Sequence, residues 1–388
     1  MKKMKKKNAI SLIVLVITII VMSILAATII ITLSNTNIID QAKDAVEKTE
    51  AQQIEEMKVL MLADGMLGKN PEPQTVGSTT LTWNDTEKKV EAKVEGVLIP
   101  EGFSYVEGTK DTGLVIEDKE GNQFVWVPVE YTATGTKDEN GLDTGFTAVF
   151  KRGTAAETSS GSGIYKMTGT LNSDYVEPYA DRYATEYYAM MKSVEKNHGF
   201  YIARFEAGDG DAITARTDET ETHKVVSKKN AYVYNYVNWG GDSTKLTKII
   251  SLSQSMYKDS SSVASTLCYG VQWDATMNFV SDADHDINNS VSWGNYSNSI
   301  NDAKTNSGSS NMNYTTGRNE AWKAKNIYDL AGNVSEWTME SISSAALICR
   351  GNFYGDTWGS THSASYRYDY GWPVADCDIG FRVTLYIQ

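Results

Sequence analysis

Hydrophobic residues run almost without interruption from Ala9 to Leu33, and this run dominates the pattern of the chain. Its only polar members are small hydroxyl residues, namely Ser11, Thr18, Ser23, Thr28 and Thr32. Because a helix rises about 1.5 Å per residue, a run of this length exceeds a hydrocarbon core of about 30 Å. The pattern therefore predicts a transmembrane helix over residues 10–33.

The charges around this run predict its orientation. Lysines fill most of residues 1–9, and the first acidic residue is Asp40. The positive-inside rule then places the N-terminus in the cytoplasm and everything after Leu33 outside. A cleaved signal peptide is the alternative, but its apolar region is usually about 7–15 residues long and ends at a small-residue site. We expect an uncleaved anchor, or a leader that is cut before the apolar run.

Residues 34–67 mix apolar and charged positions at helical spacing, which predicts an amphipathic stalk helix. Gly68 supplies a C-terminal stop, and Pro71 and Pro73 prevent continuation. The same pattern suits a filament subunit and a membrane-proximal coiled-coil spacer. The apolar positions are Ile38, Ile39, Ala42, Ala45, Val46, Ile54, Met57, Leu60 and Met61.

A globular domain is expected after the stalk. Residues 68–96 are polar and turn-rich, which predicts a linker or a small hairpin. From Val97 onward, short β-branched and aromatic runs alternate with turns, and residues 97–388 suffice for one large core. The many Tyr and Trp residues with few clear helices predict an irregular α+β fold. One short buried helix is expected over 267–280, because Val271, Ala275 and Phe279 recur at i, i+4 and i+8.

The charge balance excludes one class of partner. The chain has 36 Lys and Arg against 49 Asp and Glu, a formal net charge of −13, and the lysines before the span do not belong to the exterior. Without a basic patch, nucleic-acid binding lacks its main driving force. The cysteines Cys268, Cys349 and Cys377 are too few and too scattered for a disulfide framework or a zinc site. Cys349 and Cys377 are compatible with one disulfide or with two buried thiols.

Three motifs close the chain: NIYDLAGNVSEWTME at 326–340, ICRGNFYGD at 348–356 and DIGFRV at 378–383. Together they resemble the closing third of the formylglycine-generating enzyme (sulfatase-modifying factor) family. GFYIARFEAG, VYNYVNWGG and LCYGVQWDATMNFV, which begin at Gly199, Val233 and Leu267, resemble earlier elements of that family in the same order. The resemblance covers residues 97–388 and implies a C-type-lectin-like fold.

The resemblance also has one chemical departure. Family members that oxidise a substrate cysteine use a cysteine pair between the RG and GFR elements, whereas residues 352–376 of this chain contain no cysteine. Cys349 precedes the RG element and Cys377 directly precedes DIGFRV. We therefore expect the scaffold without the oxidase: no catalytic residue, no copper and no enzyme activity. A divergent oxidase is kept as an alternative.

A calcium site is expected in IYDLAGNVSEW, because Asp329 and Glu336 bracket a tight turn and oxygen ligands suit calcium. By resemblance to the family's calcium site, these two side chains would act as ligands together with the backbone carbonyls of Leu330, Gly332 and Val334. The alternative is a turn in which both carboxylates cap backbone amides without a metal.

Residues 352–376, called the 352–376 segment below, mix aromatic and small hydrogen-bonding residues. This composition is typical of a binding surface, because rings give contact area at low entropy cost and small polar groups adapt. The tyrosines around Arg367 are expected to be exposed, and some rings are expected to pack in the core. The candidate ligand-binding residues are Asn352, Tyr354, Asp356, Trp358, His362, Tyr366, Tyr368, Asp369, Tyr370 and Trp372.

The segment also contains no Lys, Glu, Gln or Met. Asn codons randomised at adenine cannot become these residues, and they cannot become Trp, so Trp358 and Trp372 would be fixed positions. The pattern resembles the variable region of target proteins of diversity-generating retroelements, which use the same lectin-like fold to display variable contacts.

The apolar N-terminal string NAISLIVLVITIIVMSILAATII resembles the N-terminus of bacterial type IV pilin-like proteins. By that resemblance, cleavage would fall between Ala9 and Ile10. Ala9 replaces the usual glycine, and Val14 replaces the glutamate expected at the fifth mature position. The departures favour a minor pilin or a simple anchored protein over a major pilin subunit.

These observations favour an anchored ligand-binding protein, of the adhesin or receptor type, on the bacterial cell surface. Its expected partners are the membrane and an extracellular protein or glycan, with no nucleic acid. The alternative is a minor pilin or pseudopilin subunit with pilus-like assembly partners.

Overall fold

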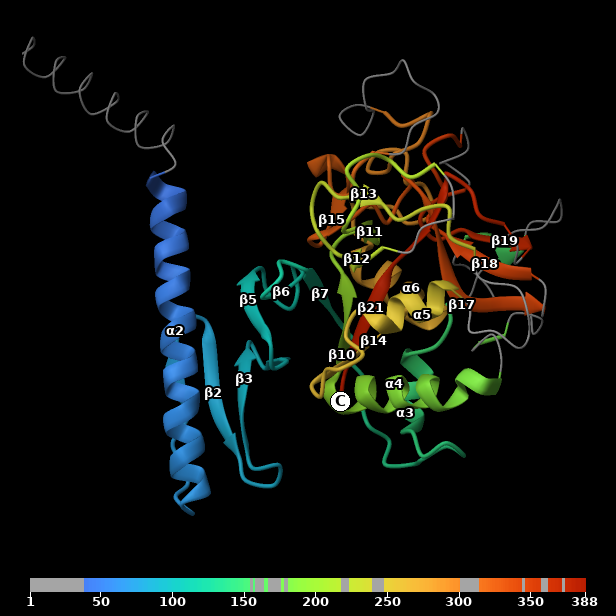
Figure 1. Ribbon diagram of the computed structural model, residues 1–388. Coiled ribbons are helices and arrows are strands. Elements are labelled where there is room, and N and C mark those ends of the chain that lie inside the picture. Colours follow the sequence, from blue (N-terminus) through green and yellow to red (C-terminus); the bar gives the residue numbers. More distant parts are fainter. Residues whose placement is uncertain are drawn as a thin grey trace, which may run out of the picture. The chain divides into compact units, whose positions relative to one another are not determined.

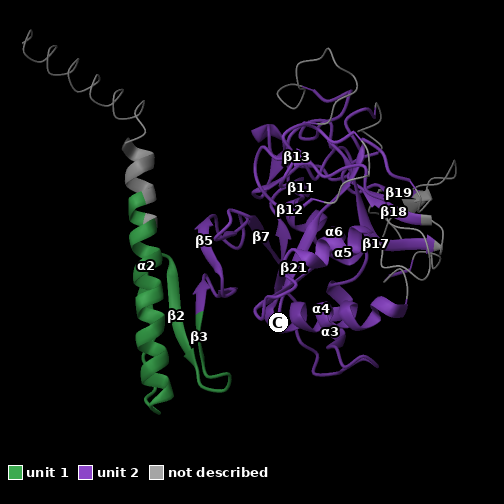
Figure 2. Cartoon of the chain, in the orientation of Figure 1, with its two compact units in different colours: residues 1–91 green, residues 92–388 purple. Residues whose placement is uncertain are grey.

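The computed structural model describes residues 38–153, 156–157, 164–166, 176–177, 181–217, 223–238, 248–300, 314–343, 346–356, 362–371 and 374–388. The chain divides into two compact units, residues 1–91 and residues 92–388 (Figure 2). Within the described residues, no helix is both long and apolar enough to span a bilayer. The predicted span over 10–33 and the processing residues Ala9 and Ile10 lie outside the described residues.

The first unit contains a long helix and a short hairpin. Helix α2 (Ile38–Met66) occupies most of the segment expected to form the stalk. It ends where Gly68 takes a positive φ of 74° and its N–H bonds the Gly65 carbonyl, as the sequence predicts for a helix stop. The hairpin follows, with β1 (Gln74–Val76) antiparallel to β2 (Thr79–Asn84). The unit boundary falls inside the next strand, β3 (Lys89–Val94), close to the expected domain start at Val97.

The second unit has a mixed α+β fold (Figure 1). Its first large sheet has the order β14-β21-β10-β7-β6-β5. Every residue of β10 and β21 is buried, so these central strands form the core of the unit. The strand expected at GFYIARFEAG is β10. The bounds are β5 (Phe103–Glu107), β6 (Val115–Asp118), β7 (Gln123–Pro128), β10 (Gly199–Ala203), β14 (Val263–Leu267) and β21 (Val383–Ile387).

Helices α3 to α6 lie in the described part of the second unit, and three of them contact this sheet. Helix α4 contacts β10 and β21, α5 contacts β14, and α6 contacts β7. His198 ends α4 in the left-handed region with φ of 60°, which lets the chain turn directly into β10. The bounds are α3 (Thr144–Val149), α4 (Ala184–Asn197), α5 (Lys248–Ser255) and α6 (Gly270–Val280).

The second large sheet has the order β20-β17-β18-β19-β9-β8 and carries the chain's closing motifs. Strand β20 runs parallel to β17, and the other described pairings are antiparallel. The chain leaves β18, passes through β19 and returns as β20, so the 352–376 segment lies at this sheet. The bounds are β8 (Ala156–Glu157), β9 (Ile164–Lys166), β17 (Ser335–Ser343), β18 (Ala346–Arg350), β19 (Arg367–Gly371) and β20 (Ile379–Phe381).

Smaller elements complete the second unit. Strand β4 pairs with β3, while β11 lies between β12 and β13, and β15 pairs with β16. The strand expected at VYNYVNWGG is reduced to β13, because the chain turns after Val233. The bounds are β4 (Val97–Ile99), β11 (Gly208–Asp209), β12 (Val225–Val226), β13 (Tyr232–Val233), β15 (Lys323–Ala324), β16 (Ile327–Tyr328) and the 3₁₀ turns η1 (Asp181–Tyr183) and η3 (Glu320–Trp322).

Helix α6 is present as expected, but its buried side differs from the prediction. Ala275 and Phe279 are only half-buried, whereas Trp273, Asp274 and Met277 are fully buried. The difference arises because the Trp273 side of the helix packs against the closing motifs.

The mixed α+β class is confirmed, and the C-type-lectin-like topology stays a prediction.

Candidate ligand-binding segment

The 352–376 segment is flanked by a buried arginine on each side, and it contains a third. Arg350, at the end of β18, places Nη2 2.7 Å from Oδ1 of Asp274 on α6, and both side chains are fully buried. The same guanidinium reaches back to the segment, because Nε donates to the Tyr366 carbonyl at 3.1 Å and Nη2 to the Ser365 carbonyl at 3.1 Å. Arg350 therefore ties the start of the segment to its middle.

Arg367 begins β19 and lies in the middle of the segment. Its Nε is 3.0 Å from each carboxylate oxygen of Glu340 on β17, and its Nη2 bonds the second oxygen of Asp274. Although burial alone would raise it, the guanidinium groups of Arg350 and Arg367 hold the pKa of Asp274 below its usual value. Asp274 thus stays charged and joins two arginines across the helix–sheet contact.

Arg382 follows the segment, in the GFR element. It forms a bidentate ion pair with Glu336 on β17, with Nη2 2.5 Å and Nε 2.9 Å from the two carboxylate oxygens. It also donates to the backbone carbonyls of Ala203 and Tyr328. Glu336 and Glu340 are both buried on β17, whose register against β18 shifts between Trp337 and Ser341. Together the three arginines hold the frame of the segment in the core.

The stretch before β19 is built into this core. Trp273 Nε1 donates to the Ala364 carbonyl at 3.0 Å, and Ser365 N–H donates to the Ile287 carbonyl at 3.1 Å. Tyr366 is 2% exposed, and its ring stacks on His362 at 4.4 Å between centroids and 13° between planes. The expectation that Tyr366 is exposed is therefore wrong. The backbone bonds from Arg350 and α6 draw this stretch inward.

Other predicted residues of the segment reach the surface in part. Tyr354, Asp356 and His362 are half-buried, and so are Tyr368 and Asp369 on β19. His362 Nδ1 lies 2.9 Å from Asp356 Oδ2. This pair connects the part of the segment that ends at Asp356 with the part that begins at His362. Asn352 is 7% exposed, and its amide donates to the His362 carbonyl, so it supports the segment more than it displays itself. Trp358 and Trp372 lie outside the described residues, as does the side chain of Tyr370.

The expected calcium ligands lie in a buried acidic region. Asp329 and Glu336 are each 1% exposed, and a third buried carboxylate, Glu206, accepts from Asn333 Nδ2 at 2.6 Å. Burial raises the pKa of Asp329 to about 7, and burial with the neighbouring Asp329 and Glu336 carboxylates holds the pKa of Glu206 well above its usual value. Arg382 is the buried cation beside them, so carboxylates outnumber cations here.

The excess of negative charge favours a cation here, but the hydrogen bonds of Asp329 and Glu336 are less favourable to calcium. Arg382 occupies both oxygens of Glu336, and Asp329 Oδ2 accepts the Gly317 N–H at 2.7 Å. Within the described residues, Asp329 Oδ1 has no hydrogen-bond partner. The Gly332 N–H bonds the Gly351 carbonyl and thereby links this turn to the RG element. Among the described residues, Asp329 and Glu336 do not join a third acidic, Cys or His side chain in a group whose ligand atoms all lie within 4.8 Å. The carbonyls of Leu330, Gly332 and Val334 belong to the same turn.

The cysteines are thiols. Cys268 and Cys349 are buried and Cys377 is half-buried, and none of the three forms a disulfide, so the bridge considered for Cys349 and Cys377 does not form. Cys349 on β18 lies opposite Tyr368 of β19, whereas Cys377 lies beyond β19 with its Sγ 3.6 Å from Tyr354 Oη. Burial raises the pKa of the Cys268 and Cys349 thiols, which disfavours the thiolate that cysteine chemistry needs.

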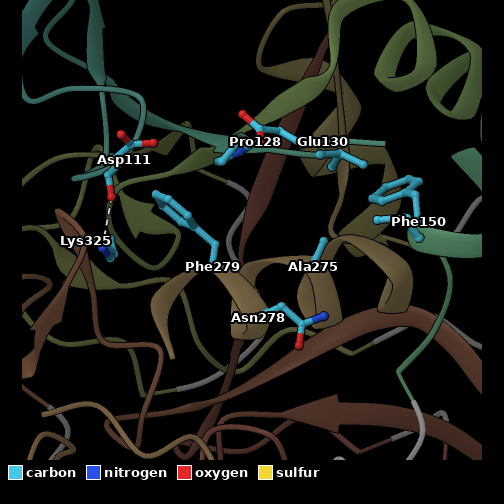
Figure 3. A pocket seen from close by; sticks show the side chains of 10 residues that line it. Asp111, Pro128, Glu130, Phe150, Ala275, Asn278, Phe279 and Lys325 are labelled. Atoms are coloured by element: carbon cyan, nitrogen blue, oxygen red, sulfur yellow. Dashed lines mark hydrogen bonds between the residues drawn. The ribbon is translucent and has the colours of Figure 1, made fainter. Parts of the chain in front are cut away.

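A cavity of about 440 Å³ lies on other elements of the second unit (Figure 3). The rings of Phe150 and Phe279 border it on two sides, with Ala275 and Asn278 of α6 between them (Figure 3). Lys325 Nζ donates to the Asp111 carbonyl at its edge. None of its lining residues belongs to the 352–376 segment, and the sequence pattern gave no indication of it. The remaining lining residues are Pro128, Val129, Glu130 and Val149.

Comparisons with known proteins give little. No protein-family profile matches the chain, and no curated protein matches it. Among solved structures, Treponema denticola variable protein 1 matches with 12% sequence identity and a TM-score of 0.28, covering 81% of this chain and 98% of that chain. Backbone similarity of this degree establishes neither a shared fold nor a shared function.

The charged residues that hold the segment were only partly visible in the sequence. Arg350 and Arg382 stand in the RG and GFR motifs, but the Asp274 carboxylate that pairs with Arg350 and the Arg367–Glu340 pair were missed. A usable signal existed, because Asp274 is the single charged residue of α6, and Glu336 and Glu340 are two charged residues within one strand. Charged residues at core positions indicate buried pairs.

Proposed function

We propose that the chain is a ligand-binding protein of the bacterial cell surface, anchored by its N-terminal apolar run. In this proposal residues 97–388 form a C-type-lectin-like domain, and the half-buried residues of the 352–376 segment contact an extracellular protein or glycan. No residue is assigned a catalytic role.

One observation carries the proposal: fully buried arginines alternate with partly exposed polar and aromatic residues along a single segment. Arg350, Arg367 and Arg382 are 0% exposed, whereas Tyr354 and Tyr368 between them reach the surface. A segment held at its two ends and its middle loses little conformational entropy when it binds a ligand. Tyrosine adds contact area and a hydrogen-bonding hydroxyl at each exposed position.

Array screening of the full-length protein tests this assignment. Binding to a glycan array and to an array of extracellular proteins is measured for the wild type, and then for the Tyr354→Ala/Tyr368→Ala double variant. We expect the double variant to lose the wild-type signals while keeping its melting temperature. Signals that survive in a folded double variant would assign binding to another surface.

We further propose that the segment is diversified in its gene. The composition of the segment supports this proposal. The buried arginines support it too, because they hold the segment while residues at its partly exposed positions change. Neighbouring DNA should then encode a reverse transcriptase and a near-copy of the gene's 3′ end. Differences between the copies should fall on codons for Tyr354, Asp356, Tyr368 or Asp369 and spare the codon for Arg367. A genome without such a copy would leave the segment a fixed binding surface.

A minor pilin subunit is the second candidate, and helix α2 is the observation that favours it. Several large apolar side chains of α2 and the turn after it are more than two-fifths exposed, which suits helix packing in a filament. Shearing of cells separates the two functions, because a subunit leaves with filaments and depends on a prepilin peptidase, whereas an anchored receptor stays with the membrane. The exposed residues are Val46, Val59, Leu60, Leu62, Met66 and Leu67.

Calcium also remains a proposal for the turn at 329–336. It is supported by the excess of buried carboxylates and by the unpartnered Oδ1 of Asp329. Asp329 would be the main ligand in this arrangement, and Glu336 would serve as the partner of Arg382.

A further inference from the structure

The cavity beside α6 lies in the size range of small-ligand sites. Its volume is about 440 Å³, and such sites measure about 300–1,000 Å³. Its apolar walls come from the end of β7, the end of α3 and one side of α6. Asp111 and Lys325 lie at one end of it and Phe150 at the other, with Phe279 between them (Figure 3). The cavity therefore has a charged end and an apolar end.

One side of α6 faces this cavity instead of the core. Ala275, Asn278 and Phe279 lie at i, i+3 and i+4, so they share a side of the helix. Ala275 and Phe279 stay half-buried although their spacing is typical of core positions. Val149, another lining residue, is 52% exposed. A ligand with an apolar group would remove this apolar surface from water, which favours binding.

The ring at the apolar end is held by the core. Phe150 stacks on Phe146 with 5.3 Å between the ring centroids, and its centroid lies 6.0 Å from that of Phe200. Phe146 and Phe200 are fully buried. Because Phe150 is already fixed from behind, it loses little conformational entropy when another ring packs on it. The apolar end is thus preorganised.

A hairpin turn places a lysine at the charged end. Lys325 and Asn326 join β15 to β16 as a two-residue turn, with φ of 49° and 66°. Lysine is disfavoured at such a position, because a residue with a Cβ is strained at positive φ. The turn is locked against a neighbouring loop, where Asn326 Nδ2 donates to the Gly113 carbonyl at 2.8 Å and Lys325 Nζ to the Asp111 carbonyl at 2.9 Å. The rim of the cavity is therefore rigid at this end.

Two opposite charges on this rim have no charged partner. Within the described residues, neither the Lys325 ammonium nor the Asp111 carboxylate forms an ion pair, whereas Glu130 pairs with Lys110 at 3.4 Å. Lys325 uses one of its three N–H donors on the Asp111 carbonyl, and Nζ lies 5.7 Å from the centroid of the Phe279 ring. Because Lys325 bonds the backbone of Asp111, both charges lie within reach of one small head group.

We propose that this cavity binds a free amino acid with an aromatic side chain, such as phenylalanine. Lys325 would donate to the α-carboxylate, and Asp111 would accept from the α-ammonium. The ring would enter between Phe279 and Phe150, where edge-to-face or offset contacts are available on two sides. An anionic ligand would face the Asp111 and Glu130 carboxylates, and a cationic one would face the Lys325 ammonium, whereas a zwitterion matches both charges.

Titration calorimetry of the full-length protein with phenylalanine tests the site. We expect one phenylalanine to bind per chain and to raise the melting temperature. Three analogues separate the parts of the ligand: phenethylamine lacks the carboxylate, phenylpropionate lacks the ammonium and glycine lacks the ring. Each should bind at least about 10-fold more weakly, because it loses a charged hydrogen bond or a buried ring. Equal binding of phenethylamine or phenylpropionate would contradict the zwitterionic ligand.

Two variants at the charged end should change the preference among these ligands. Lys325→Gln should weaken phenylalanine binding by about 10-fold to 100-fold and remove the preference over phenethylamine. Asp111→Asn should do the same for the preference over phenylpropionate. Matched controls are Lys119→Gln and Asp259→Asn, at exposed residues outside the lining, and both should bind phenylalanine as the wild type does.

A third variant tests the location of the site. Ala275→Phe places a ring inside the cavity and should abolish phenylalanine binding while the melting temperature shows a folded protein. The Tyr354→Ala/Tyr368→Ala variant should bind phenylalanine as tightly as the wild type, so this site is tested apart from the proposed function. Absence of binding at millimolar phenylalanine, or binding that persists unchanged in folded Ala275→Phe, would overturn the proposal.

Discussion

Arg367 and Glu340 form a buried ion pair in which Nε of the arginine lies 3.0 Å from both carboxylate oxygens. Arg367 lies on β19, in the middle of the segment assigned to ligand binding, and Glu340 lies on β17, with β18 between the two strands. The pair therefore fixes the middle of a surface segment from inside the domain. The buried frame of the segment can therefore stay rigid while its partly exposed residues vary.

Removal of this arginine should destabilise the domain strongly. In Arg367→Gln, Glu340 and Asp274 lose a buried counter-charge, and we expect the free energy of unfolding to fall by about 3–5 kcal/mol. Urea denaturation followed by tryptophan fluorescence measures the change. Arg318→Gln is the matched control, because Arg318 is exposed and should give a change within about 0.5 kcal/mol. Similar small effects at both positions would mean that the pair does not hold the segment.

The two neighbouring tyrosines of the segment should separate into structural and surface roles. Tyr366 is 2% exposed and stacked on His362, so Tyr366→Ala should cost about 3 kcal/mol or more of unfolding free energy. Tyr368 is half-buried, and Tyr368→Ala should cost less than about 1.5 kcal/mol. Thermal unfolding of the two variants under one set of conditions gives the comparison. Equal losses would place both rings in the core and remove Tyr368 from the binding residues.

Glu177 should make the domain less stable as the pH rises. Burial and the nearby Glu340 carboxylate raise its pKa from 4.5 to about 8. Below pH 4.5 both the folded and unfolded states hold the proton. Between these two values the folded state keeps a proton that the unfolded state releases, so the free energy of unfolding falls with pH and levels off above about 8.

Replacement of Glu177 by Gln isolates this effect. The amide has no proton to release, so Glu177→Gln should show a flatter dependence of melting temperature on pH between about 5 and 8, with a relative gain over wild type at the upper end. The slope attributable to Glu177 is at most about 1.4 kcal/mol per pH unit. Parallel curves for the two proteins would show that Glu177 does not hold a proton in this range.

Calcium should act through Asp329 if the turn at 329–336 binds it. We expect added Ca²⁺ to raise the melting temperature of the wild type, because an ion bound only by the folded state stabilises it. Asp329→Asn should remove the calcium-dependent rise, whereas Asp284→Asn should keep it. A wild-type melting temperature that does not respond to Ca²⁺ would identify the turn as a hydrogen-bonded one without a metal.

Much of the fold was predictable where periodicity or turn chemistry acts locally. The stop of α2 at Gly68 and the existence of α6 follow from such local signals, whereas the strand at Gly199 was expected from the family resemblance. The buried side of α6 was not predictable, because Asp274 is drawn inward by Arg350 and Arg367, which lie far along the chain. A prediction from local spacing places a charged residue at the surface. An ion pair with residues far along the chain can instead bury it.

The candidate site was predictable to a similar degree. Composition pointed to the 352–376 segment, and the structure leaves Tyr354, Tyr368 and Asp369 partly exposed. Tyr366 was misassigned because the exposure of a tyrosine depends on backbone bonds to other elements, here those from Arg350.

Footprinting of tyrosines in the wild-type chain tests the central claim most directly. Hydroxyl-radical oxidation is compared with and without the ligand identified on the arrays, and modification is read by mass spectrometry at each tyrosine. We expect the ligand to lower the oxidation of Tyr354 and Tyr368 and to leave the oxidation of the half-buried Tyr314 unchanged. Unchanged oxidation at Tyr354 and Tyr368, with protection instead at the half-buried Phe279 beside the cavity, would contradict it.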